Sequence, residues 1–172
     1  ANYVNSKTDK VSKGTGSYFL TLLAWPKDDD VRNYLNPDGS RRILKGGTLL
    51  SETDNPFWDV NNNPANDKTD RFTLNNTISY DVLKWLNLTS NVGADIYSTQ
   101  GLYAINPQSR YGAATSGFLS QYTQNTTNIS ANVRAGIKKD FGQFSNNLVV
   151  GFNVDNNKTR IESQRGEQFI EP

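Results

Sequence analysis

Four long runs of alternating apolar and polar residues follow residue 66, and they constrain the fold more than any other feature of the sequence. Successive side chains of a strand point to opposite faces, so this alternation predicts β-strands with one apolar and one polar face. We expect four antiparallel strands, each longer than the five or six residues of an average strand. Their expected limits are about residues 69–82, 85–98, 121–139 and 144–158.

The two faces of these strands differ in chemistry. Apolar positions of the first run hold residues such as Phe72, Leu74 and Ile78, whereas the alternate positions hold hydroxyl, amide and charged groups. The charged side chains on the polar face could line a ligand path or pair with one another. The candidates of this kind are Arg71, Asp95, Arg134 and Asp155.

The connections between the runs are alternately short, at about 82–85 and 140–143, and long, at about 99–120. Long strands with one apolar face, joined by short turns at one end and long loops at the other, are typical of a transmembrane β-barrel. Aromatic residues beside the short turns would suit a membrane interface, although aromatic residues also favour strand ends in general. Four strands cannot close a barrel, so they would form part of a larger one.

Residues 1–65 lack strand periodicity over most of their length, and we expect a loop region there. The apolar run at 18–25 predicts one short helix near 17–25, with Thr15 or Ser17 as its N-cap, although a buried strand is an alternative. Residues 36–39 read Asn-Pro-Asp-Gly, a strong turn signal. Residues 159–172 are polar again and are expected to begin another loop.

Composition narrows the possible functions. The 18 basic and 17 acidic residues nearly cancel, which gives no electrostatic reason to expect a nucleic-acid partner. The chain has neither His nor Cys, and no paired-carboxylate motif stands out, so we expect no enzyme, catalytic site or cofactor. The acidic run at 28–30 reads as a solvated turn rather than a metal site. Four aromatic residues could stack on sugar rings or pack within the loops: Trp25, Trp58, Tyr103 and Tyr111.

An ordered set of short motifs resembles a known family. The set contains residues 23–35, the Asn-Pro-Phe-Trp segment at 55–58, the approach to a strand at 67–72, the Leu-Lys-Trp-Leu turn at 83–86 and the strand at 148–152. Together these segments resemble the SusC/RagA-type TonB-dependent outer-membrane transporters of Bacteroidetes.

The resemblance implies a fold and a function. The fold is a transmembrane barrel of about 22 strands around a plug, of which this chain would supply a segment of antiparallel meander. The function is import of glycan or peptide fragments across the cell outer membrane. The implied partners are outer-membrane lipid, a SusD-like lipoprotein lid, and TonB acting through parts of the protein beyond these 172 residues. Residues 1–65 and 99–120 would then be extracellular.

A soluble all-β surface adhesin or carbohydrate-binding module is the alternative. In such a module the apolar faces of the strands would meet each other across a sandwich instead of meeting lipid.

Overall fold

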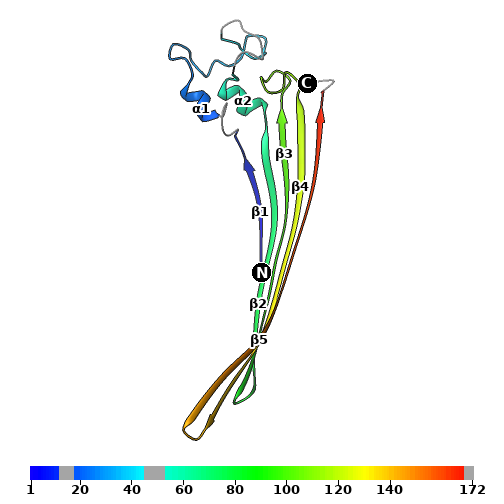
Figure 1. Ribbon diagram of the computed structural model, residues 1–172. Helices are drawn as coiled ribbons and strands as arrows, with labels where there is room; N and C mark the ends of the chain where they lie inside the picture. Colours follow the sequence, from blue (N-terminus) through cyan, green and yellow to red (C-terminus); the bar gives the residue numbers. More distant parts are fainter. Residues whose placement is uncertain (12–17, 45–52, 169–172) are drawn as a thin grey trace. The chain divides into compact units, whose positions relative to one another are not determined.

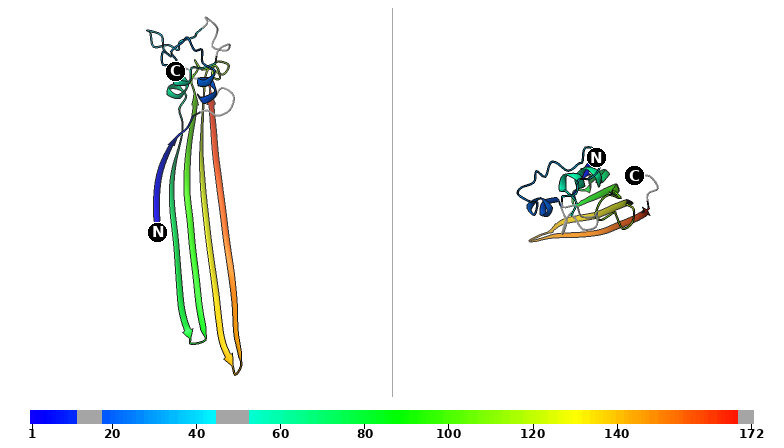
Figure 2. Two further views of the ribbon diagram at one scale, coloured as in Figure 1. Left: turned by 90° about the vertical axis from the view of Figure 1, so that its left-hand side faces the viewer. Right: turned by 90° about the horizontal axis from the view of Figure 1, so that it is seen from above.

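The chain is all-β, with a single five-stranded antiparallel sheet in the order β1-β2-β3-β4-β5. The computed structural model describes residues 1–11, 18–44 and 53–168. Neighbours along the chain are neighbours in the sheet, as the views in Figures 1 and 2 show. The predicted antiparallel meander is therefore confirmed. Its strands are β1 (Asn2–Asp9), β2 (Ala65–Leu83), β3 (Leu86–Ile105), β4 (Phe118–Phe141) and β5 (Phe144–Glu167).

The strands continue well past the alternating segments. β3 reaches Ile105 and β4 begins at Phe118, so the long connection is 106–117 and not 99–120. β5 continues to Glu167, and the loop expected from 159 is wrong. Polar pairs such as Thr126 with Thr159 (Oγ1 to Oγ1, 3.2 Å) and Gln121 with Gln164 (3.0 Å) join β4 to β5 there. Because both faces are polar in this stretch, it gives no period-two signal.

β1 lies within the segment expected to be a loop, so that expectation is also wrong. The strand pairs with β2, where Asp70 Oδ1 accepts hydrogen bonds from the Tyr3 hydroxyl (2.6 Å) and from Asn5 Nδ2 (2.7 Å). Every residue of β1 is exposed, so the strand buries no apolar face that a sequence pattern could reveal.

Two short helices are described, where one was expected. α1 (Tyr18–Leu23) confirms the helix near 17–25, and its candidate caps Thr15 and Ser17 lie outside the described residues. α2 (Pro56–Asn62) was missed. Asn55 caps it by accepting hydrogen bonds from the backbone N–H of Phe57 (2.8 Å) and Trp58 (3.3 Å), and Pro56 follows in the first turn. The dipeptide Asn55-Pro56 lies within the expected loop region, and in the structure it begins a helix.

The chain divides into two compact units. The strand unit comprises Ala1–Ser6, Thr69–Thr99 and Gln124–Ile161, all of them described, and it contains strands, their short turns and no helix. The helix unit comprises Lys7–Lys68, Gln100–Thr123 and Glu162–Pro172. Trp58 and Ile105, each 2% exposed, are the buried hydrophobic side chains among the described residues, and both belong to the helix unit. No helix in the described part of the chain is long and apolar enough to cross a membrane.

The turn between β4 and β5 depends on Gly142, which has φ +61°. A side chain at this φ meets the adjacent carbonyl oxygen, at a cost of about 1–2 kcal/mol. We expect Gly142→Ala to lower the free energy of unfolding by that amount in chemical denaturation. Gln143→Ala, at the neighbouring turn position, is the control and should have little effect; equal losses would contradict this role for Gly142.

Candidate functional site

The strand unit exposes one continuous apolar face. Ile78 is 64% and Phe152 69% exposed, although both are large hydrophobic side chains. Because the strand unit is a single sheet, nothing within it covers this face. We call these stretches the apolar band: 72–82 of β2, 86–96 of β3, 129–137 of β4 and 148–154 of β5.

The apolar band has a defined edge on every strand. In β2 and β3 it spans eleven residues each, with Asn76 and Ser90 as its polar exceptions. The next residue on the same face, two positions beyond the band and away from the short turns, is polar in all four strands. These residues are Asp70, Ser98, Thr127 and Asn156. The change from apolar to polar is therefore a property of the sheet and not of one strand.

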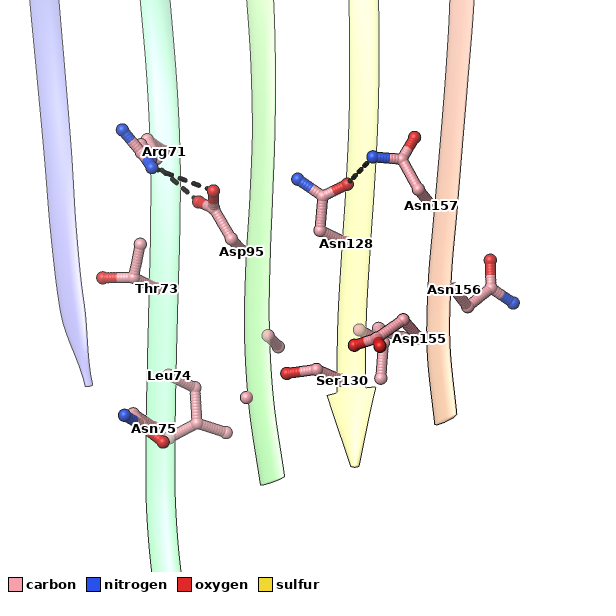
Figure 3. A pocket seen from close by; sticks show the side chains of 13 residues that line it. Arg71, Thr73, Leu74, Asn75, Asp95, Asn128, Ser130, Asp155, Asn156 and Asn157 are labelled. Carbon is pink, nitrogen blue, oxygen red and sulfur yellow. Dashed lines mark hydrogen bonds and ion pairs between the residues drawn. The ribbon is translucent and has the colours of Figure 1, made fainter. Parts of the chain in front are cut away.

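Side chains on the opposite face bond to one another across the strands. Arg71 makes a two-point ion pair with Asp95, with Nε to Oδ1 at 2.8 Å and Nη2 to Oδ2 at 2.9 Å (Figure 3). The Thr77 hydroxyl donates to Asn91 Oδ1 (2.7 Å), so β2 and β3 are also joined farther along. We call this surface of the strand unit the polar face.

A hollow of about 480 Å³ lies on the polar face. Three of the four charged residues proposed from the sequence, Arg71, Asp95 and Asp155, line it together. Arg134 does not line it; its side chain lies instead beside Gly151, where an added Cβ would come within 3.2 Å of Arg134 Cγ.

Sequence reasoning missed the uncharged part of this hollow. Asn157 Nδ2 donates to Asn128 Oδ1 (2.6 Å) along one side of it (Figure 3). Ser130 approaches Gly93 so closely that a Cβ there would lie 2.9 Å from the serine Oγ. Alternation places Asn128, Ser130 and Asn157 on this face. They were not selected as candidate site residues because uncharged polar side chains are common on exposed strand faces.

The four candidate ligand-stacking aromatics have different environments in the helix unit. Trp58 is buried, with the Arg41 guanidinium 5.5 Å from its ring centroid, and Trp25 Nε1 donates to Asp29 Oδ2 (3.0 Å). Trp58 is thus part of the buried interior of the helix unit, whereas Trp25 is half-buried and is bonded to a nearby carboxylate. Tyr103 and Tyr111 are exposed. Tyr103 also makes an edge contact with the Phe118 ring, with 5.6 Å between the centroids.

Tyr103 lines a second hollow, of about 340 Å³, within the helix unit. Lys10 and Asp67 form an ion pair in its lining, and Tyr122 lies beside them. The hydrogen bond with Asp67 raises the pKa of Lys10, and burial raises the pKa of Tyr122. Gly101 makes room for the Tyr122 ring, because a Cβ at this position would lie 1.9 Å from a ring carbon. Sequence reasoning did not predict this grouping, because its members come from four distant segments.

A buried ion pair holds the loops of the helix unit together. The side chains of Arg41 and Asp54 are 1% and 3% exposed, and Nη1 lies 2.8 Å from Oδ1. Arg41 also donates to the Gln108 carbonyl (3.0 Å), while Asp54 accepts from the Arg110 N–H (2.9 Å) and from the Ser109 hydroxyl. Three loop segments distant in sequence therefore meet at one charge pair.

In the acidic run at 28–30, Asp30 forms an exposed ion pair with Arg32, and Asp29 forms a partly buried one with Arg42. Hydrogen bonds from Arg32 lower the pKa of Asp30 to about 2, and hydrogen bonding from Arg42 lowers the pKa of Asp29. Both carboxylates are thus ionised at neutral pH. Among the described residues, no group of three acidic side chains is placed to hold a metal ion.

Neither a scan against models of known protein families nor a search of curated proteins finds a match to this sequence. The resemblance to the SusC/RagA transporters therefore stays a prediction.

The Arg41–Asp54 pair gives a testable effect on stability. Arg41→Met leaves a buried carboxylate without its counter-charge, which costs about 3–5 kcal/mol. We expect a loss of that size in chemical denaturation, detected by the fluorescence of the nearby Trp58. Arg32→Met, which breaks the exposed pair with Asp30, is the control and should leave stability nearly unchanged. Equal losses in the two variants would show that burial of the Arg41 pair is unimportant.

Proposed function

We propose that this chain supplies wall strands and outer loops to an outer-membrane, TonB-dependent importer of the SusC/RagA type. The wall would be a barrel of about 22 strands, of which β1–β5 form one part. The observation that carries the proposal is the exposed apolar band on one face of a sheet whose other face is polar and cross-bonded.

The width of the apolar band favours contact with a bilayer. A transmembrane strand needs about 9–11 residues, and the band spans eleven in β2 and in β3. Removing one Leu, Ile, Val or Phe side chain from water contributes about 1.5–3 kcal/mol. Removing all the large apolar side chains of the band from water would therefore contribute on the order of tens of kcal/mol of favourable free energy. Acyl chains would cover it without a second protein layer.

The edges of the sheet favour a larger assembly. In hydrocarbon every backbone N–H and C=O must be bonded within the protein, so only a closed barrel avoids free edges. β5 is an edge strand of 24 residues, and all of them are exposed. A further strand beside β5 would satisfy its outer backbone groups and continue the wall.

The polar face suits the interior of such a barrel. Lumen-facing positions of outer-membrane barrels are polar and tune what passes. The hollow at Arg71, Asp95 and Asp155 offers charges and amides to a passing glycan or peptide. Within the helix unit, a separate hollow at Lys10, Asp67 and Tyr103 offers an aromatic surface, which suits a sugar ring.

The connections give an orientation. In outer-membrane barrels the short turns face the periplasm and the longer loops face outward. The turns at 84–85 and 142–143 would therefore be periplasmic, while residues 106–117 and the two helices would be extracellular. There they could contact a SusD-like lid, and TonB would act through other parts of the protein.

Dependence on detergent tests the proposal against the soluble module. We expect the purified protein to stay monodisperse in detergent micelles or lipid vesicles and to aggregate when both are removed, because the apolar band would then face water. A monodisperse protein that unfolds cooperatively without detergent would contradict the proposal and support the module.

A pair of arginine substitutions tests the two faces separately. Arginine on the lipid face near the midplane costs about 2–4 kcal/mol, whereas lumen positions tolerate it. We expect a loss of that size for Ile78→Arg, measured as the free energy of folding into vesicles. Thr77→Arg, one residue away on the polar face, should cost far less. A larger loss for Thr77→Arg would reverse the assignment of the faces.

A further inference from the structure

Lys139 is the charged strand residue on the apolar-face side of the strand unit at its short-turn end. In β4 it alternates with Ile137 and Phe141, which places it on the same face as the apolar band. Its Nζ lies 5.8 Å from the centroid of the Trp85 ring and 5.4 Å from that of Phe141. In the strand unit, which is described throughout, these two rings are its partners, and no carboxylate pairs with it.

Exposed aromatic side chains occur at the same end of the sheet as this lysine. Trp85, Phe141 and Phe144 are all exposed, and the Lys138 N–H donates to the Trp85 carbonyl (2.9 Å), which joins the ends of the two hairpins. The nearest acidic residues in the sequence, Asp81 and Asp140, alternate onto the polar face. Asp81 there accepts a hydrogen bond from Asn87 Nδ2 (2.6 Å).

We propose that Lys139, Trp85 and Phe141 form a binding site for the headgroup of an anionic phospholipid. This inference rests on the proposed function, because it requires the apolar band to lie in a bilayer. Cation–π contacts hold the ammonium beside the two rings, and its N–H groups remain able to donate to a phosphate oxygen. Aromatic rings are favoured at the level of the headgroups, and the acyl chains of the bound lipid would continue along the band.

The site favours an anionic over a zwitterionic headgroup. A choline headgroup brings its own cation, and no carboxylate of this face lies at the short-turn end of the strands to receive it. A net negative headgroup matches the charge of Lys139. A lysine near a membrane surface contributes about 1 kcal/mol to anionic lipid binding, which corresponds to about a fivefold preference.

Short-range quenching can test this site, because the chain has no native Cys. Gln143→Cys places a fluorophore in the exposed turn beside Phe141 and Phe144. The protein is reconstituted in phosphatidylcholine vesicles that contain a small share of brominated phosphatidylglycerol or, in parallel, brominated phosphatidylcholine. We expect the glycerol lipid to quench more strongly at equal share, and added salt to reduce the difference.

Matched variants distinguish lipid binding at Lys139 from the general effect of removing one positive charge. Lys139→Gln should lower the preference for phosphatidylglycerol about fivefold. Lys138→Gln removes the same charge on the polar face and should leave the preference within about twofold. Trp85→Leu keeps the lysine but removes one ring, and should give an intermediate loss. No preference in the unsubstituted protein, or equal effects at 138 and 139, would overturn the inference.

A second label position tests the proposed function in the same vesicles. A fluorophore at Ile78→Cys, in the middle of the apolar band, should be quenched equally by both brominated lipids. Quenching there without a preference at Gln143 would overturn the headgroup site alone. Absence of quenching at Ile78 would contradict the proposed function itself.

Discussion

Cross-strand pairing in a fixed register is the constraint on which the rest of the structure depends. Side chains alternate along each strand, so a slip of one residue would move a whole set of side chains to the other face. The bonds of Arg71 with Asp95, Thr77 with Asn91 and Asn128 with Asn157 hold polar side chains together on one face. These pairs match the register of β2 with β3 and of β4 with β5, in which the apolar residues of paired strands share one face.

The two units are stabilised in different ways. The helix unit has the buried hydrophobic side chains and a buried ion pair, Arg41 with Asp54, that fastens three loop segments. The strand unit has cross-strand hydrogen bonds but exposes its large hydrophobic residues. Exposure of so large an apolar surface to water is unfavourable. In soluble proteins an exposed apolar patch of this extent marks an interaction surface. A bilayer on one face and an aqueous lumen on the other would suit both of its faces.

Much of the sheet could be predicted from sequence, because apolar and polar residues alternate along a strand whose two faces have different surroundings. The alternation around Phe72 and Ile78 predicted where β2 lies in the sequence and which of its side chains share a face. The extension of β5 beyond residue 158 and the whole of β1 could not be found this way, since these stretches are polar or exposed on both faces. The helix start at Asn55 could not be distinguished from a loop, because Asn-Pro occurs at both. Three charged residues that line the hollow on the polar face were among the candidates chosen from the sequence. Lys10, Asp67 and Tyr122 could not be grouped in this way, because only the tertiary fold brings them together.

Contact of the apolar band with lipid can be tested directly by the accessibility of spin labels along β2 in lipid vesicles. Nitroxides are attached to single cysteines placed one at a time from residue 72 to residue 82, and their collisions with oxygen and with a water-soluble nickel complex are compared. If the apolar band faces lipid, both collision rates should have a period of two, with oxygen collisions highest at even-numbered positions and nickel collisions highest at odd-numbered ones. Even-numbered positions shielded from both reagents would mean that the apolar band packs against protein instead of lipid.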